Sequence, residues 1–450
     1  MAERNWRPGW GWGLVLGLAL CTACVAPASK PGPTASASAT PAAQAAQGFL
    51  GGEDNPALTS LPPQVAKKIP VPASLAKNRP TWGQGRKLAE QPGFKEYSEG
   101  LRLGQAGDMA GSLKLLAQAA ERGLAEAQYE YSLRLAQGLG TEADPQLSFT
   151  YLEKAARQGL PEAQTNLGIY YRRAFGVGAD AKRSAQWFQK AAAQGDPKAA
   201  YFLADCYERG NGVEQNYRLA LDYYLFCAHH GNASACNTIG AYYQRGLGVP
   251  ADLKKAVSYY RLAAEAGFSG GQFNLAQCYA QGWGVEPNPK EATKYYALAA
   301  QAGVTLAQYK LGLAYLEGTG VERNPQEGVK WLLEAANHGS ELAAFALARC
   351  YMHGDGVARD PQKEVEWLSK AAQMKYPPAL YTLAVYYRDG RGVQADFAKA
   401  TQLLREAAIM GMPEAIAALK LIEESSKAQE KGEATKAAPA PSAAPQAGAK

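Results

Sequence analysis

A glycine-rich heptapeptide recurs eight times along this 450-residue chain, and each copy begins 36 residues after the one before it. The copies are GLGTEAD from residue 138, AFGVGAD from 174, GNGVEQN from 210, GLGVPAD from 246, GWGVEPN from 282, GTGVERN from 318, GDGVARD from 354 and GRGVQAD from 390. A second signature, Ala-Ala-x-x-Gly or a close variant, keeps the same interval and ends at residues 123, 159, 195, 231, 267, 303, 339, 375 and 411. A fixed interval without insertions indicates a repeat architecture.

The residues between the two signatures have helical spacing, as at Ala199, Leu203 and Tyr207, so each unit is predicted to be two antiparallel helices. Heptapeptide glycines such as Gly212 can take the left-handed conformation that ends a helix. The last heptapeptide residue is always Asp or Asn, which caps a following helix. A phosphate-binding loop would need a preceding strand and a Lys-Ser/Thr ending. We therefore interpret the heptapeptide as a turn between helices.

The pattern Ala199-x-Tyr201-x-Leu203-x-x-x-Tyr207-x-x-Gly210-x-Gly212-Val213, with an aromatic residue at 223 and the Ala-Ala-x-x-Gly signature, resembles the Sel-one-like repeat (SLR) family, relatives of tetratricopeptide repeats. The resemblance covers about residues 124 to 411. It implies an all-α fold, a right-handed α-solenoid (superhelix) of antiparallel helix pairs, whose members mostly act as scaffolds that bind other proteins. Residues 94–123 resemble a tetratricopeptide-like first unit, and the segment from Pro413 to about Lys427 resembles a terminal cap. We therefore expect the solenoid to span residues 91–425.

The N-terminus has the layout of an export signal. Arg4 and Arg7 precede an apolar run over residues 13–20, which predicts a signal peptide over residues 1–23. Thr22 and Ala23 before Cys24 resemble the lipobox of bacterial lipoproteins, so Cys24 is the expected lipidation site; a cleaved secretory signal and an uncleaved anchor are the alternatives. Val25 stands where inner-membrane lipoproteins usually carry Asp. The resemblance thus implies an outer-membrane lipoprotein facing the periplasm, with a soluble periplasmic or secreted protein as the alternative.

Two further segments are predicted to lie outside the solenoid. Residues 24–90 are rich in Ala, Pro and Ser, and residues 426–450 end in APAPSAAPQAGAK. Such compositions bury too little apolar surface to offset the entropy lost on ordering. We expect a disordered tether and a disordered tail.

Candidate binding residues follow from the resemblance, because the first helix of each pair lines the concave side of tetratricopeptide-like stacks. One row is predicted at Tyr129, Thr165, Tyr201, Asn237, Phe273, Tyr309, Phe345 and Tyr381, and its aromatic members from 201 onward are the candidate site. Beside this row lie the arginines Arg172, Arg173, Arg209, Arg245, Arg349 and Arg388. Aromatic and Arg side chains dominate interface hot spots. The alternatives are that the aromatic row is repeat packing and that the arginines belong to a solvated face.

No partner or chemistry of another class is indicated. A formal net charge of +6 over 450 residues, without a run of basic residues, does not suggest nucleic acid. No catalytic motif is present, no cofactor is expected, and the four histidines are too few and too far apart for a metal site. Cys206, Cys278 and Cys350 recur two units apart, too far to be bridged, and are expected to be buried free thiols. Cys227 and Cys236 flank one turn, a placement that resembles the helix-linking disulfides of cysteine-rich SLR proteins, and whether they are bridged stays open.

The sequence therefore predicts a non-catalytic scaffold of the cell envelope, which holds a partner protein or peptide in the concave groove and is attached to the membrane by a lipid anchor. One alternative is a protein that binds peptidoglycan or polysaccharide, in which stacked aromatics meet the sugar faces. Another is a weak β-lactam hydrolase, as described for cysteine-rich SLR relatives.

Overall fold

The computed structural model describes residues 60–77 and 82–436, and every regular element in those ranges is a helix. Consecutive helices pack in pairs at the predicted interval, which confirms the all-α repeat fold. The chain divides into two compact units, which are described separately. Unit 1 comprises the described residues 82–190, and unit 2 comprises residues 60–77 together with residues 191–436.

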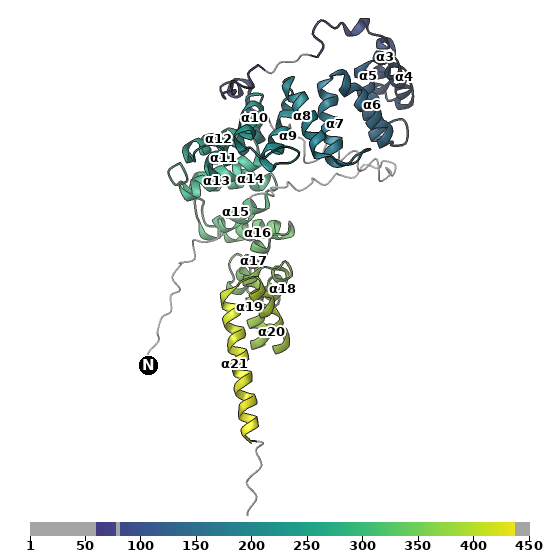
Figure 1. Cartoon of the computed structure of the whole chain (residues 1–450). Coiled ribbons are helices and arrows are strands. Elements are labelled where there is room, and N and C mark those ends of the chain that lie inside the picture. Colours follow the sequence, from purple (N-terminus) through teal and green to yellow (C-terminus); the bar gives the residue numbers. More distant parts are fainter. Residues whose placement is uncertain (1–59, 78–81, 437–450) are drawn as a thin grey trace, which may run out of the picture. The chain divides into compact units, whose positions relative to one another are not determined.

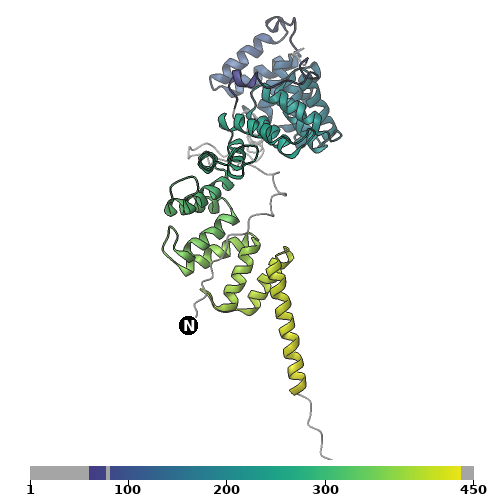
Figure 2. The same ribbon diagram turned by 90° about the vertical axis from the view of Figure 1, so that its left-hand side faces the viewer.

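The helices from α3 to α20 have nearly constant length, from 12 to 14 residues, whereas α2 and η1 are short and α21 is the longest (Figures 1 and 2). Unit 1 contains η1 (Leu88–Glu90), α3 (Phe94–Gln105), α4 (Met109–Glu121), α5 (Ala125–Gln137), α6 (Pro145–Gln158), α7 (Pro161–Arg173) and most of α8 (Ala181–Ala193). Unit 2 contains α2 (Pro63–Ala66), α9 (Pro197–Arg209), α10 (Tyr217–His229), α11 (Ala233–Arg245), α12 (Leu253–Glu265), α13 (Ser269–Gln281), α14 (Pro289–Gln301), α15 (Thr305–Glu317), α16 (Pro325–Asn337), α17 (Glu341–His353), α18 (Pro361–Gln373), α19 (Pro377–Asp389), α20 (Phe397–Ile409) and α21 (Pro413–Lys436).

The heptapeptide ends one helix and begins the next, as predicted. Its first glycine takes the left-handed conformation, with φ of 68° at Gly210 and 76° at Gly318, and so closes the helix before it. Its last residue caps the helix that follows: the Asn216 side chain accepts a hydrogen bond from the Leu219 backbone N–H at 3.0 Å.

The second glycine of the heptapeptide lies directly against the backbone of the preceding repeat. A methyl group on Gly320 would lie 2.1 Å from the carbonyl oxygen of Pro289, and one on Gly284 would lie 2.3 Å from that of Leu253. In each case the partner is the first residue of the second helix in the preceding repeat. A side chain at this position would therefore push the loop off the neighbouring helix.

Small side chains form the centre of the helix packing. The two alanines of the Ala-Ala-x-x-Gly signature are buried in every repeat of unit 2 except the last, where Ala408 is partly exposed, and at α10 Cys227 replaces the first of them. Alanine allows close approach of helix axes. One apolar cluster of unit 2, named here the C-terminal apolar cluster, joins α16 to α21 through residues such as Leu332, Leu347 and Leu368.

Both ends of the predicted solenoid are helical. The Asp108 carboxylate accepts a hydrogen bond from the Gly111 backbone N–H at 2.8 Å and begins α4, so residues 94–121 form a helix pair with a short turn. At the other end α21 runs to Lys436, beyond the expected boundary at residue 425. Its second half is rich in Glu, Lys, Gln and Ala, which favour a helix even without packing.

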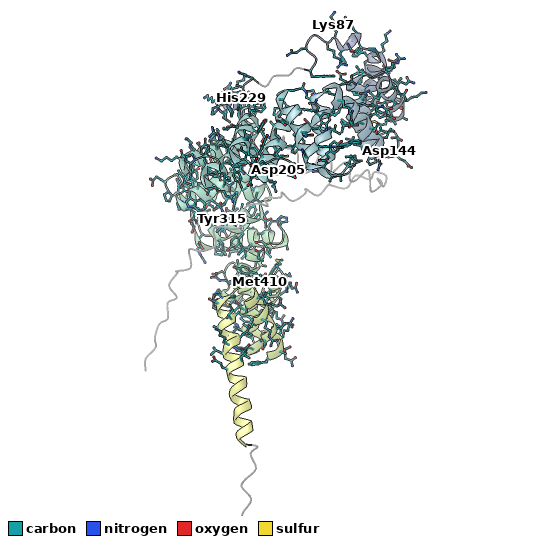
Figure 3. The ribbon with its side chains drawn as sticks, viewed as in Figure 1. Lys87, Asp144, Asp205, His229, Tyr315 and Met410 are labelled. Atoms are coloured by element: carbon teal, nitrogen blue, oxygen red, sulfur yellow. The ribbon has the colours of Figure 1, made fainter. Side chains whose placement is uncertain are left out.

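Part of the segment expected to be a tether packs against unit 2. Residues 60–77, named here the N-terminal strap, lie beside the end of α10 (Figures 1 and 3). The Leu61 backbone N–H donates to the Gly231 carbonyl at 2.7 Å, and His229 Nδ1 donates to the Ile69 carbonyl at 2.8 Å. In unit 1, Arg86 Nη1 pairs with Glu126 Oε1 at 2.6 Å. Composition alone misses the contacts of the strap because its apolar residues are interspersed with Pro, Ser and Lys and because the residues that it contacts lie about 160 positions further along the chain.

The export signal and the lipidation site at Cys24 lie outside the described residues. Among the helices of residues 60–77 and 82–436, none combines the length and the apolar character that crossing a bilayer requires.

Candidate functional site

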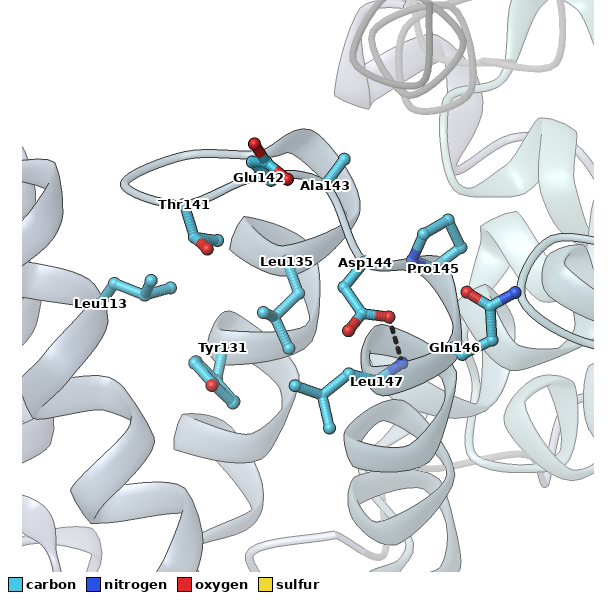
Figure 4. Close-up of a pocket in the computed structure, with 10 residues that line it drawn as sticks. All are labelled: Leu113, Tyr131, Leu135, Thr141, Glu142, Ala143, Asp144, Pro145, Gln146 and Leu147. Atoms are coloured by element: carbon cyan, nitrogen blue, oxygen red, sulfur yellow. Dashed lines mark hydrogen bonds between the residues drawn. The ribbon is translucent and has the colours of Figure 1, made fainter. Parts of the chain in front are cut away.

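The hollow beside the heptapeptide belongs to the repeat architecture. In the first repeat it is lined by the end of α5, the loop and the start of α6, including Tyr131, Leu135 and Asp144 (Figure 4). The same hollow recurs seven repeats later around Tyr387 and Asp396. The Asp144 carboxylate is already engaged, because it accepts a hydrogen bond from the Leu147 N–H at 2.9 Å. Both hollows thus follow from the shape of the turn.

Two members of the predicted aromatic row serve packing. Phe273 is only 4% exposed and its ring centroid lies 5.8 Å from that of Tyr296. The Tyr201 hydroxyl lies 3.2 Å from the Ser234 hydroxyl on the next repeat, and burial raises the pKa of Tyr201. At these two positions the side chains pack within a repeat or against the next one.

The C-terminal members of the row keep part of their surface open. Tyr309 on α15, Phe345 on α17 and Tyr381 on α19 are half-buried and pack against the edge of the C-terminal apolar cluster. Tyr376 joins them, with its ring edge-on to Phe345 at a centroid distance of 5.4 Å. These four residues are named here the aromatic ladder.

The predicted arginines differ in their pairing. Arg209 Nε lies 2.6 Å from Asp205 Oδ1, and Arg388 Nε lies 2.6 Å from Asp389 Oδ1. In unit 1, Arg172 and Arg173 are engaged as well. The remaining two, Arg245 and Arg349, are exposed and form no ion pair with any residue that the structure describes.

Arg349 lies within electrostatic reach of the aromatic ladder. Burial and the neighbouring Tyr376 raise the pKa of Tyr309, and the positive charge of Arg349 opposes that shift. Lys310 Nζ lies 5.7 Å from the centre of the Tyr309 ring. The face formed by α15, α17 and α19 therefore combines partly open aromatic rings with an unpaired guanidinium group.

The five cysteines in the described ranges are free and buried, including Cys227 and Cys236. The cross-turn bridge is thus not formed in this structure, where the Cys227 thiol instead donates to the Pro197 carbonyl at 3.3 Å. Burial raises the pKa of Cys236 to about 12 and holds that of Cys227 well above its ordinary value. Thiols in such surroundings are poor nucleophiles.

His230 and His338 each form a separate hydrogen bond. His230 Nδ1 donates to the Phe226 carbonyl at 2.8 Å, and His338 Nδ1 lies 3.0 Å from the Gln308 side-chain oxygen. Within residues 60–77 and 82–436, no three His, Cys, Asp or Glu side chains are grouped so as to hold a metal ion.

Two features of the last repeats escaped the sequence reasoning. Tyr376 lies outside the predicted row, and its only signal was that Lys375-Tyr376 interrupts the glycine turn of the other repeats. Glu364 is buried where other repeats have Ser, Ala or Gly. It accepts hydrogen bonds from Tyr386 and from Arg391, the latter at 3.3 Å. This cluster joins the last two repeats.

Comparison with known proteins agrees with the architecture. The Sel1 repeat matches eight segments, at residues 125–160, 161–196, 197–232, 233–268, 269–304, 305–340, 342–376 and 377–412. A Sel1 repeat protein from Oxalobacter formigenes is 28% identical, with a TM-score of 0.58 over 74% of this chain and 94% of that chain. A protective antigen of uropathogenic Escherichia coli, described as displaying an SLR fold, is 26% identical, with a TM-score of 0.45 over 80% of this chain and 97% of that chain.

A search of curated proteins gave no match. The eight matched segments cover well over half of the sequence and follow the helix pairs of the structure. The chain therefore belongs to the Sel1 repeat family, whose repeats typically mediate protein–protein interactions.

Proposed function

We propose that this protein is a non-catalytic scaffold that holds an extended, acidic segment of a partner protein against α15, α17 and α19. The observation that carries the proposal is the aromatic ladder with unpaired Arg349 beside it. An exposed Arg without an ion pair is free to bind a carboxylate of the partner. A preformed helical surface also limits the ordering cost of binding.

The spacing of the ladder suits an extended ligand. Tyr309, Phe345 and Tyr381 stand at one position in successive repeats, and neighbouring helices lie about 10 Å apart. A segment in the polyproline II conformation advances about 3.1 Å per residue, and every third side chain points to the same side. Every third residue of the bound segment would then meet one aromatic side chain, with an Asp, a Glu or a terminal carboxylate at Arg349.

The cell envelope is part of the proposal, and it rests on the N-terminal sequence. Export would bring the ladder into contact with envelope proteins, and lipidation at Cys24 would hold it at a membrane. Binding of peptidoglycan or polysaccharide would use the same aromatic rings, but the unpaired cation favours an acidic peptide.

Selection of peptides from a random displayed library tests the proposal. We expect the selected peptides to carry acidic residues and to repeat apolar residues every third position. Arg349→Glu should abolish their binding, and Tyr309→Ala with Phe345→Ala should weaken it. The matched control is Arg405→Glu, which makes the same charge change on the exposed surface of α20. Peptides that bind equally to the wild type and to Arg349→Glu would refute the site, and retention on purified sacculi lost with the aromatic pair would favour the glycan alternative.

A further inference from the structure

The N-terminal strap shows what kind of segment a turn of unit 2 can bind. At the turn between α10 and α11, the Leu61 backbone N–H donates to the Gly231 carbonyl, and the His229 ring donates to the Ile69 carbonyl. Leu61 and Ile69 stand on either side of α2 and are only 3% and 5% exposed. The turn thus binds two apolar residues of the strap through one backbone acceptor and one side-chain donor.

The surface of α10 beside the strap is apolar. Phe226 is 3% exposed, whereas the same repeat position holds exposed charged residues at Lys190 and Glu334. A buried Phe at a position that is elsewhere exposed indicates a surface covered by another segment. The hydrogen bond from His229, three residues after Phe226, places the strap at this surface.

The turn between α14 and α15, two repeats later, has the same features. At the positions of Phe226, His229 and Gly231 it carries Leu298, Gln301 and Gly303. Gly231 and Gly303 both take the left-handed conformation, with φ of 96° and 85°. The Gln301 amide is a donor, as the His229 ring is. The intervening turn has Glu265 at this position, and an ionised carboxylate does not donate.

The groups of this second turn are open to a ligand. Leu298 is 40% exposed, Leu306 across the turn is 38% exposed, and Gln301 is exposed. Among residues 60–77 and 82–436, no backbone donor forms a hydrogen bond with the Gly303 carbonyl. Leu298, Gln301, Gly303 and Leu306 are named here the edge site. Because Leu306 lies one helical turn before Tyr309 on α15, the edge site adjoins the aromatic ladder.

We propose that the edge site binds a strap-like segment of a partner protein, in which two apolar residues flank a short turn. The first of them donates its backbone N–H to the Gly303 carbonyl, and the second presents its carbonyl to the Gln301 amide. Their side chains cover Leu298 and Leu306. In such contacts the main-chain hydrogen bonds supply affinity and the apolar contacts supply specificity.

The size of the edge site favours a short segment over a second copy of the chain. A stable interface between folded proteins buries about 800 Å² on each partner. Two partly exposed leucines provide only a small part of that area, but they suit a segment with two apolar residues. The edge site also recognises no carboxylate, so it is a second surface, distinct in chemistry from the ladder with Arg349.

A peptide with the sequence of residues 60–77 is the probe. It carries three Lys and no acidic residue, so it is not a ligand for Arg349. We expect the fluorescein-labelled peptide to bind the full chain saturably in an anisotropy titration. Leu298→Asp with Leu306→Asp should lower the affinity at least tenfold. Absence of saturable binding to the wild type, or equal affinity for this variant, would overturn the proposal.

A matched variant controls for the charge change. Leu219→Asp with Leu253→Asp alters leucines that are 37% and 41% exposed at the first turns of α10 and α12. This variant should bind the peptide as the wild type does, and the far-ultraviolet circular dichroism of both variants should match the wild type. An equal loss of affinity in the control would show that the edge site is not specific and refute it.

Photocrosslinking identifies where the peptide binds. Photoleucine takes the place of Leu61 in the peptide, and after illumination we expect cross-links within residues 298–306 of the full chain. Cross-links confined to residues 226–232 would show that the peptide only exchanges with the resident strap, and would overturn the proposal. N-methylation of the photoleucine removes the donor to Gly303 and should lower the yield of the expected cross-link.

Discussion

The α-carbon of Gly320 lies so close to the carbonyl oxygen of Pro289 that an added methyl group would stand 2.1 Å from that oxygen. The contact joins the loop of one repeat to the first turn of a helix in the repeat before it. Because Pro289 O is a backbone atom, the clash cannot be relieved by a change of rotamer. The same close contact occurs at Gly176, Gly284 and Gly356, so in these repeats a single glycine sets how closely the loop lies against the preceding repeat.

Gly320→Ala should therefore lower the free energy of unfolding by more than about 2 kcal/mol, since the left-handed backbone alone costs an alanine about 1–2 kcal/mol and the clash adds to it. Urea denaturation measures the loss. Gly303→Ala is the matched control, because Gly303 has a φ of 85° but nothing within 4 Å of an added methyl group. Equal losses for the two variants would contradict the close-contact argument.

Two repeats carry a side chain where the backbone favours glycine. Ala174 has a φ of 56° and Lys375 a φ of 61°. Ala174→Gly and Lys375→Gly should each raise the free energy of unfolding by about 0.5–1 kcal/mol, because the strain removed exceeds the added entropy of the unfolded chain. Lys375 pairs with Glu406 at the surface, and such a pair contributes little. Lys375→Ala, which loses the pair and keeps the strain, should give no gain in thermal unfolding.

The repeat and its turns could be predicted because their chemistry is local. A capping Asn216 or a left-handed Gly210 acts on neighbouring residues, so the sequence reveals its role directly. The ion pair between Arg209 and Asp205 is also a local interaction, because the two residues are one helical turn apart. The strap could not be predicted, because its contacts cross about 160 residues and its composition resembles a tether. The one signal was Phe226, an apolar residue at a position that is charged in most other repeats.

The repeat pattern alone does not predict which aromatic residues of the candidate site are exposed. Phe273 and Phe345 occupy the same repeat position, yet Phe273 is buried and Phe345 is partly open. Position within the repeat is identical, so only the neighbouring residues distinguish them. Tyr296 covers Phe273, whereas Phe345 meets the edge of Tyr376.

This difference predicts unequal costs for the same substitution. Phe273→Ala should lower the free energy of unfolding by about 3–5 kcal/mol, as expected for a buried Phe. Phe345→Ala should cost clearly less and should instead weaken binding of acidic peptides. Chemical denaturation and peptide titration of both variants provide the test, and a larger stability loss for Phe345→Ala would count against its assignment to the site.

Buried tyrosines should make the protein sensitive to alkali. Burial raises the pKa of Tyr170 to about 12, against the lowering effect of its hydrogen bond with Ser148. Both the folded and the unfolded chain keep this proton below pH about 10, and above it the unfolded chain loses the proton first. Stability should therefore fall between pH about 10 and 12. Tyr170→Phe should reduce the slope by about 1.4 kcal/mol per pH unit, and an unchanged slope in urea titrations would contradict the assignment.

The free thiols give a prediction about redox state. Because Cys227 and Cys236 are both buried and unbridged, neither should react with a thiol reagent such as dithionitrobenzoate at neutral pH in the folded protein, while both should react when the chain is unfolded in urea. Burial keeps these thiols protonated, and the thiol form is a weak nucleophile. Cys236→Ala should leave the apparent mass of the peptide containing Cys227 unchanged after digestion without reductant. A linked peptide from the wild type under the same conditions would instead establish the cross-turn disulfide.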